Sequence, residues 1–494
     1  MRQGEPLTYS GWQIPRSEGL FGLSTGATIG VIVGAVISII CFATGGPLFG
    51  AIITAVWVCC GAPLLIRVDG RSLYEITVTR WQFMRLKKKG LTKYISGPFS
   101  KVPGGHYMLP GVLATTRLHE YTSPGGRRFG IIHNPQKNEY TIVFRVWPQG
   151  DEAVDQDVTN RNIFQWGSYL AYLGSEGDIV GATAVVETVP STGQRVRQEV
   201  ASITSPSSPR LAQQIMAEAA DIQATGRLET HARLALTFTA TTNERRRHWQ
   251  DQAVVIGQRL PALASNLQSA GLVVREMTKD EIVQVAARSY SPARAEEIEQ
   301  AAFTQEGHGL GWEDAGPGSA EQTPTLYKHD GAVSTTWEMR EPPRGSVTDK
   351  VLRSLLAPNP DLPRKRVALC YRPHSAAEAA KIVDDDYSDA LQAVRGSRKA
   401  TPSAQAMIRL ASTEQATKEE ARGHGVSRFG ILLTITETDE AKIPNADAVL
   451  KSLSQQARIK IRRRYGSQQI SFAAGLGLGV LIPEHVSTAG MMQL

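Results

Sequence analysis

Three histidines and one glutamate are the first candidates for chemistry, because imidazole and carboxylate groups bind metals and transfer protons. They are His106, His119, His133 and Glu120, and all lie in one stretch rich in glycine and proline. Their spacing matches no metal motif, so we interpret them as surface or capping side chains. A membrane-tethered enzyme that uses His106, His119, Glu120 and the loop 307–314 (GHGLGWED) remains an alternative.

The sequence lacks the common signatures of nucleotide and peptide hydrolysis. No G-x-x-x-x-G-K-[ST] motif and no Gly-Lys dipeptide occurs, so the lysine that would contact the β- and γ-phosphates of a nucleotide is missing. The H-E-x-x-H and C-x-x-C patterns are also absent. We therefore expect a protein that is not an ATPase or another enzyme, with no catalytic residue, no cofactor and no metal site.

A long uncharged stretch predicts that the chain enters a membrane. Between Glu18 and Arg67 there is no charged residue and no histidine, and about 20 apolar residues suffice for one helical crossing. Because Gly45-Gly46-Pro47 interrupts the stretch, we expect a transmembrane hairpin over 26–66, with helices over 26–44 and 48–66. A cleaved signal peptide and a buried hairpin of a soluble protein fit less well, since the stretch starts late and has no polar face.

Positive charge is concentrated directly after the uncharged stretch. Residues 67–93 hold eight lysines and arginines against two acidic residues, in a chain whose formal net charge is +7. By the positive-inside rule we expect this flank to lie in the cytoplasm, together with the bulk of the chain and the N-terminus. The protein is then a multi-pass protein of the cell inner membrane. The residues that we expect to contact anionic lipids at the membrane surface are Arg80, Trp81, Arg85, Lys87, Lys88 and Lys89.

A second basic segment, 458–464, alternates like a strand and places Lys460, Arg462 and Arg464 on one face. That face is either the solvated side of an edge strand or a docking surface for an acidic partner. Direct DNA contact through the basic run 80–93, supported by the clusters 245–249, 364–366 and 458–464, is a further alternative, which we do not favour.

Apolar periodicity divides the rest of the chain into α+β modules. Strand patterns occur at 129–132, 140–147, 179–189, 229–239, 272–275, 333–339, 366–371, 429–436 and 459–464. Helix patterns occur at 154–173, 210–224, 249–269, 348–356 and 446–457. Further helices are expected after the capping boxes at 278–281 and 375–378, where the second helical region is divided into two helices near 400–402. We expect mixed α/β modules with mixed sheets, of the ferredoxin-like type. The expected order is a cytoplasmic segment 1–25, the hairpin 26–66, a basic juxtamembrane connector 67–125, a first module 126–303, a linker 304–325 and a second module 326–494.

Several motifs resemble integral membrane proteins of actinobacterial conjugative elements, which are grouped with the type VII secretion component EccE. These motifs are 11–12 (GW), 15–16 (PR), 94–98 (YISGP), 102–105 (VPGG), 109–111 (LPG), 117–120 (RLHE), 364–373 (RKRVALCYRP) and 464–468 (RYGSQ). The layout also resembles a PrgI-like hairpin fused to the N-terminal domain of the conjugative type IV secretion ATPase, and it stops where the P-loop domain of that ATPase would begin.

The resemblance implies a non-catalytic scaffold subunit of a conjugative, type IV-like DNA or protein translocation complex, which docks a separate P-loop ATPase and contacts other membrane subunits. An EccE-like component of type VII protein secretion is the alternative. Gly26, Gly30 and Gly34 recur every four positions, a spacing that lets membrane helices approach closely and favours a homo-oligomer. The transported substrate and the identity of the ATPase stay open.

Overall fold

The structure is a computed structural model that describes residues 7–9, 25–68, 71–98, 100, 106–147, 154–224, 226–302, 307–343, 345–395, 404–420, 425 and 427–482. The chain divides into two compact units. One comprises residues 13–92 and 483–494, and the other comprises residues 1–12 and 93–482. We call them the N-terminal unit and the sheet unit.

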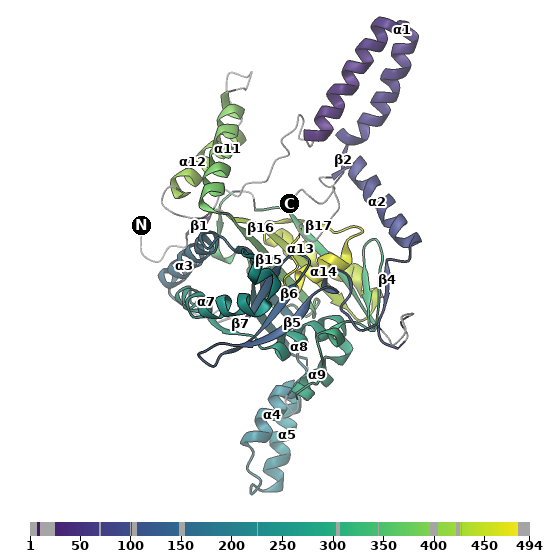
Figure 1. Cartoon of the computed structure of the whole chain (residues 1–494). Coiled ribbons are helices and arrows are strands. Elements are labelled where there is room, and N and C mark those ends of the chain that lie inside the picture. The colour runs from purple at the N-terminus through teal and green to yellow at the C-terminus, as the bar shows by residue number, and fades with distance from the viewer. Residues whose placement is uncertain are drawn as a thin grey trace. The chain divides into compact units, whose positions relative to one another are not determined.

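The N-terminal unit is built on α1 (Thr25–Leu65), whose backbone leaves the helical region at Gly46, with φ 82° and ψ 168°. The chain reverses at this point, where the sequence predicted an interruption, and the two helical segments lie side by side (Figure 1). A Cβ atom on Gly34 would lie 1.8 Å from the Trp57 indole, so this position needs glycine. Part of the predicted glycine stripe therefore packs within the chain.

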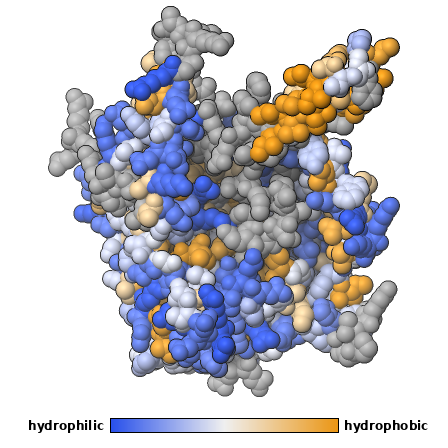
Figure 2. Space-filling model, turned by 45° about the horizontal axis from the view of Figure 1, so that its top comes forward, coloured by the Kyte–Doolittle hydropathy of each residue, from blue (hydrophilic) through white to orange (hydrophobic). Residues whose placement is uncertain are grey.

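The surface of α1 is almost entirely apolar. Among the described residues, one helix, Ile29–Leu48, is long and apolar enough to cross a membrane, and Gly50–Cys59 is a shorter apolar helix. Large aliphatic side chains are exposed on both segments, for example Ile32 on the first and Ile52 on the second. Figure 2 shows this apolar surface in orange.

A charged helix, α2 (Leu73–Lys88), follows α1 after the short pair β2 (Arg67–Val68) and β3 (Arg71–Ser72). The Ser72 side chain accepts a hydrogen bond from the Glu75 N–H, and three cations occupy the last turn, so both helix ends are favourable. The connector predicted over 67–125 is therefore not one irregular segment. Its first part contains this helix, and the part after residue 92 belongs to the sheet unit.

Beside a two-stranded sheet of β1 (Thr8–Tyr9) and β14 (Val347–Thr348), the described strands of the sheet unit form one 13-stranded sheet. Its main path runs β4-β11-β12-β13-β16-β15-β8-β9-β7-β6-β5, while β10 pairs with β7 and β17 with β13. Every pairing between these strands is antiparallel, so the prediction of mixed sheets was wrong. The bounds are β4 (Lys93–Ile95), β5 (Arg117–Thr122), β6 (Arg128–Asn134), β7 (Glu139–Trp147), β8 (Ile179–Pro190), β9 (Leu228–Thr239), β10 (Val273–Glu276), β11 (Ser319–Gln322), β12 (Tyr327–His329), β13 (Ala332–Glu341), β15 (Lys365–Pro373), β16 (Ser427–Glu437) and β17 (Lys460–Arg463).

The two halves of the sheet repeat one topology. In the first half the chain runs β7-α3-β8-β9-α7-β10 and the strands lie in the order β10-β7-β9-β8. In the second half it runs β13-α10-β15-β16-α13-β17 and the order is β17-β13-β16-β15. A strand pair precedes each half and a helix, α8 or α14, follows it. The helices are α3 (Gln156–Ser175), α7 (Trp249–Ser269), α8 (Lys279–Tyr290), α10 (Arg353–Leu356), α13 (Ile443–Gln456) and α14 (Gln468–Gly475).

The halves are joined edge to edge by β8 and β15, which pair antiparallel from Lys365↔Thr188 to Tyr371↔Ala182. A single hydrophobic core under α8 and α14 spans both halves and includes Val185 of β8, Ala368 of β15 and Phe472 of α14. Separate cores under α3 with α7 and under α13 complete the packing. The predicted linker 304–325 consequently does not separate two compact units, because it contains β11 and the sheet is continuous.

Each half carries a helical hairpin at the same topological place, between β8 and β9 in the first half and between β15 and β16 in the second. The first arm is α4 (Gln194–Ile203) with α5 (Arg210–Ala224), and the second arm is α11 (Ala376–Arg395) with α12 (Ala404–Glu420). Because β8 and β15 are antiparallel, the arms leave the sheet at opposite ends (Figure 1). Both arms expose large apolar side chains, namely Ile203, Leu211, Ile215, Ile222, Met407 and Ile408.

Candidate functional site

The residues predicted at the membrane surface lie together on α2 and its C-cap. Arg80, Trp81, Arg85, Lys87, Lys88 and Lys89 are all exposed, and the Arg85 guanidinium lies 5.3 Å from the centroid of the Trp81 ring. Phe83, on the same helix, is buried. The exposed set has the charge and aromatic content that anionic lipid headgroups require, and lipid contact stays a prediction.

The predicted docking face on β17 is largely neutralised by β13. Lys460 pairs with Glu341 at 2.9 Å, and Glu338 accepts hydrogen bonds from both Arg462 and Arg464. Arg464 is buried, so the docking prediction was wrong for this residue. The sequence pattern showed the cations but not the acidic residues of the neighbouring strand that face them.

Two of the three predicted histidines lie next to each other, with the ring centroids of His119 and His133 5.9 Å apart. His119 stacks on Trp249 with a centroid distance of 4.2 Å, and His133 stacks on Tyr140 at 4.4 Å. Burial lowers the pKa of both imidazoles, that of His133 to about 4, so both are neutral at pH 7. His106 instead packs edge-on against Tyr94. The described part of the chain holds no group of three side chains that could bind a metal ion.

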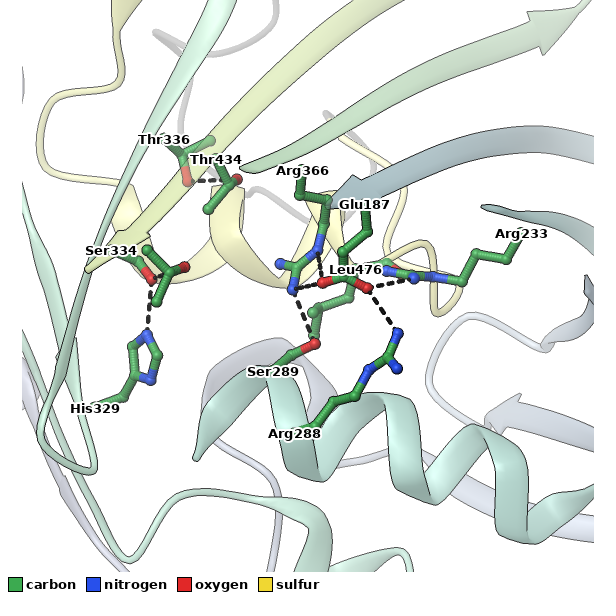
Figure 3. Close-up of polar contacts among 11 residues, drawn as sticks. Glu187, Arg233, Arg288, Ser289, His329, Ser334, Thr336, Arg366, Thr434 and Leu476 are labelled. Atoms are coloured by element: carbon green, nitrogen blue, oxygen red, sulfur yellow. Dashed lines mark hydrogen bonds and ion pairs between the residues drawn. The ribbon is translucent and has the colours of Figure 1, made fainter. Parts of the chain in front are cut away.

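Sequence reasoning missed a buried cluster in which three arginines surround one glutamate (Figure 3). Glu187 of β8 accepts hydrogen bonds from Arg233 of β9 at 2.8 Å, from Arg366 of β15 at 2.9 Å and from Arg288 of α8 at 3.2 Å. Arg366 also donates to the Ser289 hydroxyl at 2.8 Å. The cluster therefore joins both halves of the sheet to α8.

All four members of this arginine cluster carry charge at neutral pH. Burial alone would raise the pKa of the Glu187 carboxyl, but the guanidinium groups, Arg366 foremost, hold that pKa well below its ordinary value. Burial lowers the pKa of Arg233 only to about 10. Three positive charges therefore lie around one negative charge, which leaves the cluster with an excess of positive charge away from water.

A cleft opens beside the cluster and encloses about 680 Å³, its open mouth included. Arg288, Ser289 and Arg366 line it together with Arg364 and Glu299. A second cleft of about 640 Å³ adjoins the first. Glu229 and His231 line both clefts, and Arg145, Arg195 and Trp147 line only the second. This arrangement has the composition of a site for an anionic ligand.

Signals for this cluster are present in the sequence. Glu187 interrupts the predicted strand 179–189 (IVGATAVVETV), which is otherwise apolar or small, and Arg233 precedes the apolar part of the predicted strand 229–239 (ETHARLALTFT). Arg366 belongs to the basic segment 364–366, which we had considered for DNA contact, but its side chain is buried. A charged residue inside a buried strand needs a partner, and the pairing of β8 with β15 supplies it.

Comparison with known proteins matches the N-terminal part of the chain to a family model. A family model described as a domain of unknown function (DUF8461) matches residues 16–75, a range that includes α1 and the start of α2. Among curated proteins no sequence matches the chain.

Proposed function

We propose that the protein is a membrane-anchored, non-catalytic scaffold subunit of a conjugative, type IV-like DNA or protein translocation complex, and that it docks a separate P-loop ATPase. The observation that carries the proposal is the exposed apolar surface of α1, which ends next to the cationic helix α2. Such a surface suits lipid rather than water. An EccE-like role in type VII secretion is the alternative.

We infer that α1 crosses the inner membrane twice, with the sheet unit in the cytoplasm. The turn at Gly46 leaves about 20 residues on each side, enough for about 30 Å of helix on each. The cations on α2 favour the cytoplasmic side for the flank that leads into the sheet unit.

Each half of the sheet unit is further proposed to be a ferredoxin-like module. In support, each half has the chain order βαββαβ with the fourth strand beside the first and the third beside the second. The two helical arms extend from these modules and expose apolar side chains. Exposed apolar residues on a projecting helix are typical of protein docking surfaces.

Purification from native membranes in mild detergent, followed by mass spectrometry, tests the scaffold proposal. We expect a P-loop ATPase and further membrane subunits to accompany the protein, with or without nuclease. The double variant Leu211→Glu, Ile222→Glu on α5 should reduce their recovery at least tenfold, whereas Gln214→Glu on the same helix should not. Recovery of the protein alone, or with nucleic acid only, would overturn the proposal, and recovery of type VII secretion subunits would favour the alternative.

The topology predicts the reactivity of a cysteine introduced at Ser207, an exposed residue at the tip of the first arm. A membrane-impermeant maleimide should leave Ser207→Cys unlabelled in intact cells and label it after the cells are permeabilised. The unsubstituted chain serves as the control for its four native cysteines. Efficient labelling of intact cells would place the sheet unit outside the cytoplasm.

A further inference from the structure

We propose that the two adjoining clefts beside Glu187 bind an oligophosphate, either pyrophosphate or the phosphate chain of a nucleotide. This inference goes beyond the scaffold proposal and does not depend on it. It rests on three observations: the charge of the arginine cluster, its unused hydrogen-bond donors and the lining of the second cleft.

The first observation is the charge balance. Arg233, Arg288 and Arg366 share a single carboxylate, that of Glu187. Removing an uncompensated charge from water costs several kcal/mol per ion, so natural clusters of this kind are normally neutralised by a partner. Six lysines and arginines line the two clefts, against three glutamates. Positive charges therefore still outnumber negative ones when all the lysines, arginines and glutamates that line the two clefts are counted.

The second observation is that donors remain unused. Among the described atoms, Nη1 of Arg366 and Nε of Arg288 are buried and have no hydrogen-bond partner. Arg366 itself is only 5% exposed, and both residues line the first cleft. A buried donor without a partner costs about 1–3 kcal/mol. Phosphate oxygens match the planar guanidinium fork and would satisfy such donors.

The third observation extends the site beyond one phosphate. Arg145 and Arg195 line the second cleft, which meets the first at Glu229 and His231. Burial lowers the pKa of the Arg145 guanidinium, Glu281 opposes that effect, and the nearby Arg288, Arg275 and Arg195 lower it further. Arginines therefore line both clefts, with Arg145 also paired to Glu281 at 3.3 Å and Glu229 lying where the clefts meet.

The rim also carries carboxylates, and these limit what can bind. The Ser191 hydroxyl donates to Glu229 at 2.6 Å, and the Thr192 hydroxyl donates to Glu299 at 2.5 Å. Both carboxylates would repel a long polyanion that lies across the mouth. Because Arg366 is buried as well, a compact oligophosphate suits the clefts better than a continuous nucleic-acid strand.

Isothermal titration of the full chain in mild detergent tests this inference, with sodium pyrophosphate, adenosine triphosphate and inorganic phosphate as probes. We expect pyrophosphate to bind at least tenfold more tightly than phosphate. Arg288→Gln should weaken pyrophosphate binding at least tenfold, and the exposed Arg195→Gln should weaken pyrophosphate but not phosphate. Arg127→Gln, whose side chain pairs with Glu276 away from the residues that line the two clefts, is the matched control and should change binding less than twofold.

The nucleotide and the free oligophosphate are distinguished by their relative affinities. Equal affinities for pyrophosphate and adenosine triphosphate would show that the phosphates alone are recognised, and a tighter nucleotide would show that the nucleoside contributes. Absence of saturable binding by both probes at millimolar concentration would overturn the inference. So would unchanged pyrophosphate binding in Arg288→Gln and Arg195→Gln, or binding of a single-stranded oligonucleotide but not pyrophosphate.

Discussion

Replacing Glu338 with alanine should destabilise the sheet unit by about 3–5 kcal/mol, because removing one member of a buried ion pair leaves its partner as an uncompensated buried charge. Glu338 is buried and accepts hydrogen bonds from Arg462 and from the equally buried Arg464. Unfolding of the full chain in detergent by urea, followed by tryptophan fluorescence, measures the change.

Glu341→Ala provides the matched control on the same strand. Glu341 pairs with Lys460, whose side chain is about half exposed. An exposed ion pair contributes about 0–1 kcal/mol, so the loss of stability should be several times smaller than that of Glu338→Ala. Equal losses in the two variants would mean that Arg464 is solvated in the folded protein, contrary to the structure.

Acidification from pH 7 to pH 5 should reduce the stability of the sheet unit by about 2 kcal/mol through His329 alone. His329 is 1% exposed, and burial lowers its pKa to about 4. One imidazole nitrogen contacts the Tyr290 carbonyl oxygen, and the other lies 2.8 Å from the Ser334 hydroxyl. The folded state therefore favours the neutral ring.

The sign follows from the order of the two pKa values. The pKa of His329 is about 6.5 in the unfolded chain, where the ring is solvated, and about 4 in the folded chain. At a pH between these two values the unfolded chain binds a proton that the folded chain does not, so stability falls as the pH falls. His133, with a pKa also lowered to about 4, adds in the same direction. The arginines hold the pKa of the Glu187 carboxyl well below its ordinary value, so the stability that its ionised form contributes is likewise lost as the pH falls.

Comparison of the unsubstituted chain with His329→Gln isolates this effect. Urea denaturation at pH 7, 6 and 5 should show a smaller dependence of the unfolding free energy on pH in the variant, even if the variant is less stable throughout. Identical pH dependence in both proteins would show that the pKa of His329 is the same in the folded and unfolded states, which would contradict the prediction.

Local patterns in the sequence predicted the individual elements well. The capping box at 278–281 is present at the start of α8 with both of its hydrogen bonds. The strands predicted over 129–132 and 140–147 are present as the antiparallel pair β6–β7. Such elements are encoded by residues that lie close together in the chain, through periodicity and capping chemistry.

The duplicated topology and the arginine cluster could not be predicted in the same way. They depend on contacts such as Arg366 with Glu187, which are 179 residues apart, and no repeated motif marks the two halves. The strand 458–464 shows the same limit, because the burial of Arg464 follows from its contact with Glu338 on β13. Burial and partners of charged residues are properties of the assembled sheet.

The antiparallel junction of β8 and β15 also has a mechanical consequence. Tension between the two arms would pull these strands in opposite directions along their own axes, because each arm follows the carboxyl end of its strand. Seven residue pairs connect the strands, from Lys365↔Thr188 to Tyr371↔Ala182, and in this shear geometry their hydrogen bonds share the load instead of opening one by one. A pull exerted on one arm would thus be transmitted across the molecule to the other without separating the halves.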